Sequence, residues 1–130
     1  MSVTHSAVIP YRRTADGKEV LLITSHRRFR WIVPKGVVEP GMNAAASACK
    51  EAYEEAGILG NVSADPIGTY AYEKCGRTCT VTVFLMEVLA VLDVWPESRS
   101  RRRRWANVEM AAAEVKRPDL ELLIRRVHDV

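Results

Sequence analysis

Apolar and polar positions in the first quarter of the chain follow a pattern typical of β-strands. Residues 6–9 and 20–24 are apolar and rich in β-branched side chains, which favours strands. Asp16-Gly17 lies between them and favours a turn. We therefore expect two strands joined by a turn, followed by a short strand fragment over 31–33.

Residues 44–56 have the composition of a helix. Most of them are strong helix formers, Asn43 suits the N-cap, and Gly57 suits the C-terminal cap. Small residues recur at helical spacing, which lets one side of the helix approach a sheet closely. This small-residue stripe consists of Ala45, Ala48, Ala52 and Ala56.

The second half of the chain predicts a covered central strand. Residues 68–74 read as a strand, Gly76 favours a turn, and 78–90 read as a long strand with apolar residues on both faces. The further expected elements are a strand over 101–105, a short helix over 107–115 and an amphipathic helix from Pro118. Strands with helices on both faces predict an α/β fold of the α/β/α sandwich type, as one domain over residues 1–130.

Composition narrows the classes of protein. The chain has 130 residues and a net charge of +3, and no apolar run approaches the length of a membrane-spanning helix. Residues 1–10 lack a charged segment followed by an apolar one, so we expect no signal peptide and a cytoplasmic protein. The three cysteines are expected to be free thiols. A metal site at Cys75 and Cys79 is not favoured, because a second pair is missing.

Basic residues are concentrated in two clusters. Arg27, Arg28 and Arg30 form the first, and Arg99 with residues 101–104 forms the second. Such clusters suit polyanions, either phosphorylated small molecules or nucleic acid. A solvated charged surface is the alternative, and for the second cluster both interpretations stay open. Nucleic acid is not the favoured ligand, because aromatic residues are only moderately frequent.

Three carboxylates share one face of the expected helix. Glu51, Glu54 and Glu55 are spaced by three and four residues. Oxygen ligands of high negative charge suit a hard cation, magnesium or alternatively manganese. A solvated acidic helix face is the more frequent explanation for three such residues alone. A glycine-containing loop and Lys35 lie just upstream, and cations for phosphates beside anions for a metal favour a phosphoryl-transfer site.

The segment 36–58 resembles the Nudix box, whose pattern is G-x5-E-x7-R-E-U-x-E-E-x-G-U, with U an aliphatic residue. The matching positions are Gly36, Glu51, Ala52, Glu54, Glu55, Gly57 and Ile58. The resemblance implies a mixed-sheet α/β/α sandwich and hydrolysis of a diphosphate linkage. It also implies that Glu51 and Glu55 are the main metal ligands, that Glu54 is a supporting one, and that Glu51 or Glu55 is the catalytic base.

Two positions depart from the pattern of the box. The first glutamate is replaced by Met42, and the arginine by Lys50. In the family this pair is thought to brace the loop against the helix. A loss of both partners strands no buried charge, so we expect activity to survive with a looser loop. Lys50 is expected to pair with Glu39 or to stay in solvent.

The resemblance extends to the diphosphoinositol polyphosphate phosphohydrolases. It is carried by residues 25–28 and 31–36, by the run 78–85, and by Trp95-Pro96-Glu97 followed by basic residues ending at Trp105. It implies cleavage of diphosphoinositol polyphosphates or diadenosine polyphosphates, both dense in negative charge. The expected substrate-binding residues are Arg27, Arg28, Lys35, Gly36 and Arg77.

Other functions stay open on the sequence. Tyr70 and Tyr72 lie in the region where diadenosine polyphosphate hydrolases often carry a tyrosine, whereas Pro66 lies too close to the box for the proline favoured by ADP-ribose hydrolases. A pyrophosphohydrolase of nucleoside triphosphates or RNA 5′ ends is the alternative within the enzyme class. A Nudix-fold sensor without turnover is the alternative of another class. A monomer and a homodimer are equally compatible with the sequence.

Overall fold

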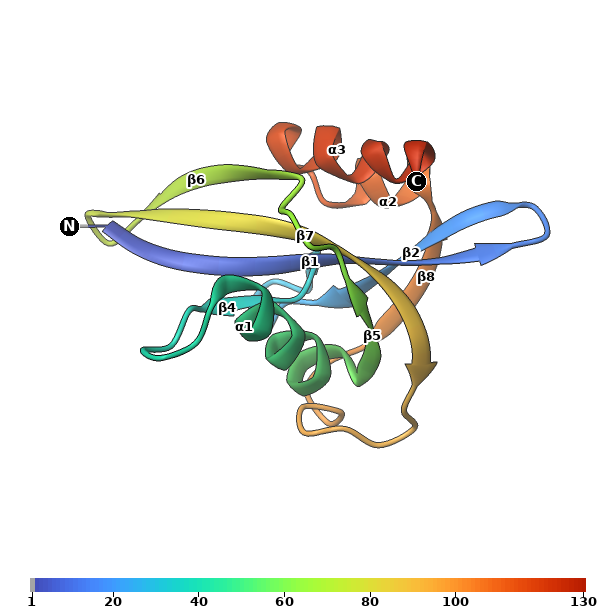
Figure 1. The fold of residues 1–130 in the computed structure, drawn as a ribbon, viewed down its shortest axis with the longest axis horizontal. Coiled ribbons are helices and arrows are strands. Elements are labelled where there is room, and N and C mark those ends of the chain that lie inside the picture. Colours follow the sequence, from blue (N-terminus) through green and yellow to red (C-terminus); the bar gives the residue numbers. More distant parts are fainter. Residues whose placement is uncertain (1) are drawn as a thin grey trace.

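In the computed structural model, which describes residues 2–130, helices cover both faces of one mixed sheet (Figure 1). The strands are β1 (Ser2–Thr14), β2 (Gly17–Thr24), β3 (Trp31–Ile32), β4 (Lys35–Val37), β5 (Ile58–Val62), β6 (Gly68–Lys74), β7 (Arg77–Val91) and β8 (Arg103–Asn107). The helices are α1 (Ala44–Glu51), α2 (Val108–Glu114) and α3 (Pro118–Arg125), with a π-helical turn η1 (Ala52–Ala56) and a 3-10 turn η2 (Arg126–Asp129). The predicted α/β/α sandwich with a mixed sheet is confirmed.

Strands β1 and β7 form the centre of the sheet and run parallel, with Ala7 opposite Val83. The other strand pairs are antiparallel. Hydrogen-bonded strands follow the order β3-β2-β1-β7-β5 across the sheet. Three further strands pair with members of this series: β4 with β1, β6 with β7 and β8 with β2. The expected turn at Asp16-Gly17 closes the β1–β2 hairpin, in which Thr14 pairs with Gly17.

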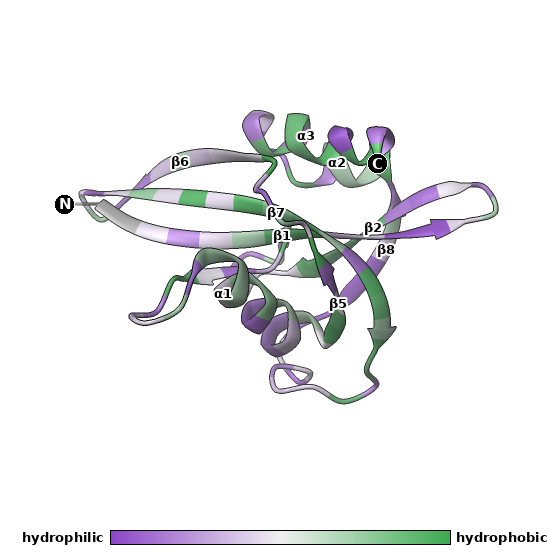
Figure 2. Cartoon of the chain, viewed as in Figure 1, coloured by the Kyte–Doolittle hydropathy of each residue, from purple (hydrophilic) through white to green (hydrophobic). Residues whose placement is uncertain are grey.

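Each face of the sheet carries its own apolar core. Val81 and Val83 pack with residues of α2 and α3, whereas Phe84 and Met86 pack with residues of α1 and η1. Successive side chains of a strand point to opposite faces, so the two-sided apolar pattern predicted for 78–90 is confirmed. Figure 2 shows these apolar stretches of β1 and β7 between the two helical layers.

The predicted helix over 44–56 is present, but its last turn is π-helical. The side chain of Asn43 accepts a hydrogen bond from the Ala46 amide (2.8 Å), which confirms the N-cap. Ala48, Ala52 and Ala56 are fully buried against the sheet. The wider π turn lies over the residues that carry two of the three glutamates, and such turns often occur at functional sites.

Two strands were not expected, and one strand begins later than expected. Strands β4 and β5 were not anticipated, because β4 has only three residues and β5 contains a glycine beside a register shift against β7. Strand β8 begins at Arg103 rather than 101. Over the described residues, no helix is both long and apolar enough to span a bilayer.

Candidate active site

Glu51 and Glu55 bring their carboxylates together beside strand β4. Their side chains share a hydrogen bond. Oε1 of Glu55 also accepts a hydrogen bond from the backbone amide of Lys35 (3.1 Å). Oε2 of Glu55 lies 3.3 Å from the guanidinium of Arg101. Glu55 is only 8% exposed, so these contacts replace water around a carboxylate that the fold has buried.

Burial raises the pKa of Glu55 to about 8, although Arg101 and the Lys35 amide oppose the rise. Burial also raises the pKa of Glu51, and the neighbouring charge of Glu54 adds to the effect. Two contacting carboxylates with raised pKa values favour either a shared proton or a cation between them.

The chemistry of these donors fits a hard divalent cation. Glu51 and Glu55 offer only oxygen ligands, and a cation between the two carboxylates would relieve their repulsion. Within residues 2–130, no three His, Cys, Asp or Glu side chains are grouped closely enough to hold a metal as they stand. Glu54, the third glutamate, forms an ion pair with Lys50 (3.1 Å).

Lys50 links the loop before the helix to the helix itself. Its Nζ lies 2.9 Å from Glu39, and this confirms one of the two expectations for Lys50. Glu39 is in the loop between β4 and α1. The loop is therefore held to the helix by an ion pair, although the pair starts from Glu39 and not from position 42.

The loop between β7 and β8 holds the other end of the helix. This loop and the first residue of β8 donate hydrogen bonds to three successive carbonyls of η1, groups that a helix end leaves without partners. The bonds run from the Glu97 amide to Glu54 (3.1 Å), from the Trp95 indole to Glu55 (3.0 Å) and from the Arg103 guanidinium to Ala56 (3.0 Å). This loop, 92–102, thereby fixes the turn that carries Glu54 and Glu55.

Gly57 fits this arrangement for two reasons. Its φ of +64° lies in the left-handed region that glycine adopts without strain. A Cβ at this position would lie 2.7 Å from Cγ of Trp95. The predicted glycine stop is therefore also the surface on which Trp95 packs.

The second basic cluster is largely engaged within the protein. Arg101 contacts Glu55 and Glu97, Arg103 lies 3.7 Å from the ring centroid of Trp95, and Arg104 lies 4.4 Å from that of Trp31. Arg101, whose side chain is only 7% exposed, therefore fits neither interpretation left open for this cluster, a surface for polyanions or a solvated charged surface. Its arginines hold the loop and the glutamate turn in place.

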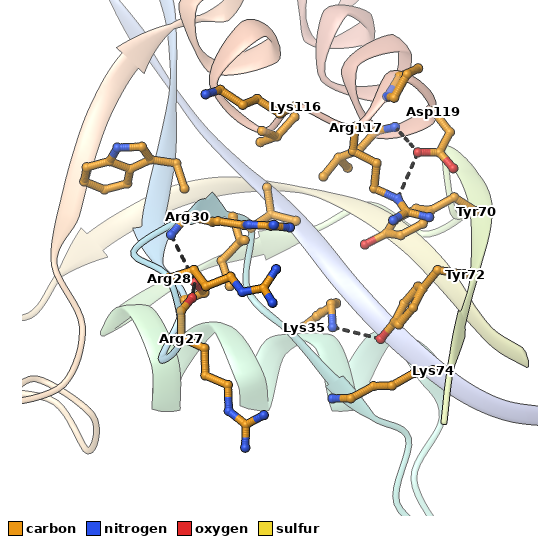
Figure 3. Close-up of a pocket in the computed structure, with 17 residues that line it drawn as sticks. Arg27, Arg28, Arg30, Lys35, Tyr70, Tyr72, Lys74, Lys116, Arg117 and Asp119 are labelled. Carbon is orange, nitrogen blue, oxygen red and sulfur yellow. Dashed lines mark hydrogen bonds and ion pairs between the residues drawn. The ribbon is translucent and has the colours of Figure 1, made fainter. Parts of the chain in front are cut away.

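A cavity of about 840 Å³ is lined by the segment after β2, by β6 and by the start of α3 (Figure 3). One carboxylate, Asp119, lines it, and Asp119 pairs with Arg117 (3.0 Å). The cationic residues that line it are Arg27, Arg28, Arg30, Lys35, Lys74, Lys116 and Arg117. Such an excess of positive charge suits a ligand with several phosphates.

The structure gathers most of the predicted substrate-binding residues. Arg27, Arg28 and Lys35 line the cavity. Gly36 follows Lys35 in β4 and lies against Glu51, where a Cβ would fall 2.5 Å from Oε2. Arg77 begins β7 at the turn after β6 and is not among the described residues that line the cavity, so its role stays a prediction.

Sequence reasoning missed Lys74, Lys116 and Arg117. Lys116 and Arg117 lie between two short helices, and only the packing of α3 beside β6 brings them to the cavity. The Lys116-Arg117-Pro118 run before a helix was the available signal, but no local pattern places this run near Lys35.

The turn that carries Arg27 and Arg28 is strained. Arg28 and Phe29 have φ values of 66° and 47°, in a region costly for residues with a Cβ. The Ser25 amide donates to the Arg30 carbonyl (2.8 Å), and the Arg30 amide donates to the Ser25 hydroxyl (3.1 Å). These bonds hold the turn closed and keep its arginines at the cavity rim.

Comparison with known proteins agrees with this geometry. The model of the NUDIX domain matches residues 3–127. Nudix hydrolase 13, mitochondrial, of Arabidopsis thaliana is 34% identical over 82% of this chain and 63% of its own length. Diphosphoinositol polyphosphate phosphohydrolase 3-beta of Homo sapiens is 38% identical over 76% of this chain and 61% of its own length. The chain thus spans under two thirds of the length of these curated relatives.

A solved structure agrees over nearly the whole chain. The binary complex of the Ap4A hydrolase of C. elegans superimposes with a TM-score of 0.83 at 27% sequence identity. The superposition covers 95% of this chain and 93% of that one. This chain and that structure therefore share the same overall fold.

Proposed function

Because the chain belongs to the NUDIX domain family, we propose that it hydrolyses a phosphoanhydride bond in a highly anionic substrate, with magnesium as its cofactor. The candidate substrates are diadenosine polyphosphates and diphosphoinositol polyphosphates, and the names of two matched proteins include these compound classes. We also propose a cytoplasmic location, whereas the names of two plant relatives place those proteins in mitochondria.

The position of Lys35 is the observation that carries this proposal. Its backbone amide donates to Glu55 (3.1 Å), whereas its Nζ reaches Tyr72 Oη (3.1 Å) inside the cationic cavity. One residue therefore connects the carboxylates to the phosphate-binding cavity. A polyphosphate held by Lys35 would bring a phosphoanhydride bond to the glutamates.

The roles follow from the surroundings of each residue. Glu51 and Glu55 would hold the magnesium ion, with Glu54 in support once released from Lys50. A bound magnesium ion supplies positive charge for the phosphate oxygens and for a water. Glu51 or Glu55 accepts the proton of the attacking water. Arg27, Arg28 and Lys35 bind the phosphates that are not cleaved.

The test is a product assay with magnesium over a panel of substrates. The panel contains a diadenosine polyphosphate, a diphosphoinositol polyphosphate, ADP-ribose and a nucleoside triphosphate. We expect cleavage of at least one of the first two, and loss of cleavage when a chelator removes the metal. Cleavage of nucleoside triphosphates alone would favour the pyrophosphohydrolase alternative. Binding without turnover of any compound would favour the sensor alternative.

A further inference from the structure

Two tyrosines form an aromatic wall in the cationic cavity. Tyr70 and Tyr72 lie on β6, their ring centroids are 6.4 Å apart, and their planes are inclined by 29°. Aromatic side chains in a basic groove commonly stack on nucleobases. Whether a base can stack here depends on what already covers the faces of these rings.

Arg117 lies against both rings, and Lys35 lies at the hydroxyl end of Tyr72. The guanidinium carbon of Arg117 lies 4.7 Å from the ring centroid of Tyr70 and 5.3 Å from that of Tyr72. Nζ of Lys35 lies 5.1 Å from the centroid of Tyr72. Tyr70 is only 7% exposed. Arg117 thus makes cation–π contacts with both rings, and the buried ring of Tyr70 leaves little surface for a base.

Arg117 is anchored in this position from two sides. Nη2 donates to the Ala71 carbonyl of β6 (2.9 Å), and Nε lies 3.0 Å from Asp119 at the start of α3 (Figure 3). A planar guanidinium held by two partners is already ordered. Moving it to admit a base would break both contacts and both cation–π interactions.

We propose that Arg117 closes the aromatic wall of this cavity to a nucleobase and thereby determines the substrate class, a polyphosphate without a base in the cavity. This inference rests on the function proposed above. The cavity recognises its ligand by charge, through the cations that surround it. A diphosphoinositol polyphosphate, with phosphates on several sides of a ring, fits this environment better than a diadenosine polyphosphate.

The experiment compares kcat/KM for diadenosine tetraphosphate and for a diphosphoinositol pentakisphosphate, both with magnesium. The wild-type protein is expected to favour the inositol compound. Arg117→Ala exposes the ring of Tyr70, and stacking of one base is worth about 1–3 kcal/mol. The ratio of nucleoside to inositol kcat/KM should therefore rise about fivefold or more in this variant.

Lys116→Ala is the matched control. It removes one positive charge from the same cavity but uncovers neither tyrosine. We expect both substrates to lose kcat/KM together, with a ratio that changes less than about twofold. An equal rise of the ratio in Lys116→Ala and Arg117→Ala would overturn the inference, because general loss of charge would then explain it.

Asp119→Asn covers the case in which Arg117→Ala does not fold. This variant weakens one anchor of Arg117 and should shift the ratio in the same direction by a smaller factor. An unchanged ratio in the folded variants, or a wild-type preference for the diadenosine compound, would overturn the inference. If the wild-type protein cleaves neither compound, the proposed function fails, and equilibrium binding of the same two compounds to the same variants decides the inference.

Discussion

Arg101 and Glu55 form an ion pair across 3.3 Å, with side chains that are only 7% and 11% exposed. Arg101 also contacts Glu97 (3.0 Å) and donates to the carbonyl of Thr24 (2.9 Å). A buried pair adds little net stability, but removal of one partner leaves the other charge without compensation. The glutamate turn therefore depends on a residue that follows it by 46 positions in the sequence.

Arg101→Met is expected to lower the free energy of unfolding by about 3 kcal/mol, because the buried carboxyl of Glu55 and the carbonyl of Thr24 both lose the guanidinium as a partner. Urea denaturation measures this change. Arg102→Met is the matched control, because the side chain of Arg102 is exposed beside the same loop, and its effect should stay within about 0.5 kcal/mol. Equal stabilities of the two variants would contradict the role assigned to Arg101.

Gly36→Ala is expected to reduce activity by displacing Glu51. The added Cβ would lie 2.5 Å and 2.6 Å from the two carboxylate oxygens of Glu51, so the carboxylate must move away. We expect weaker binding of manganese, measured by isothermal titration calorimetry, together with a fall in kcat of about tenfold or more.

Gly41→Ala would serve as the comparison for Gly36→Ala, since a Cβ at Gly41 meets nothing within 4 Å. Its left-handed φ of 85° makes it the more strained substitution in the backbone. A loss of metal affinity in Gly41→Ala but not in Gly36→Ala would argue against the contact with Glu51.

Glu51→Gln and Glu55→Gln should each abolish magnesium-dependent turnover, with losses of about a hundredfold or more, while the fold stays intact. Initial rates and circular dichroism together measure both properties. Glu121→Gln, on the opposite helical layer, controls for the removal of a carboxylate. Wild-type rates in both active-site variants would contradict the assignment of Glu51 and Glu55 as metal ligands.

Cys49 is expected to react slowly with thiol reagents, because burial raises its pKa. A raised pKa leaves less thiolate at a given pH, so the rate should keep rising with pH above the ordinary value of 9.0. Exposed Cys75 should react first. Stopped-flow labelling of the wild-type protein and of Cys75→Ser separates the two, and a fast phase that survives in Cys75→Ser would contradict this assignment.

Local sequence patterns predicted those elements of the fold that depend only on residues close together in the sequence. The cap at Asn43, the stop at Gly57 and the two-sided strand 78–90 depend on neighbours in the sequence, and the structure confirms them. Strand β4 was not predictable in this way. Its three residues form a strand only because β1 provides hydrogen-bonding partners for Lys35 to Val37.

The candidate site was predictable in its composition but not in its contacts. The spacing of Glu51, Glu54 and Glu55 placed them on one helix, and the pair of Lys50 with Glu54 is a local i,i+4 contact. Only tertiary packing, however, turns Glu55 toward Arg101. The same holds for Arg117, which reaches the cavity because α3 packs beside β6. Contacts between distant segments carry no signature in one sequence.

The hydrogen bonds from the loop 92–102 and from Arg103 to the helix end have a consequence for biosynthesis. Two of them join residues 40 and 47 positions apart, and a chain grows at roughly 5–20 residues per second. The glutamates therefore leave the ribosome seconds before the donors that fix them. A nascent chain that ends before Trp95 carries the whole motif without an ordered site, so the site matures only when the last third of the chain has been made.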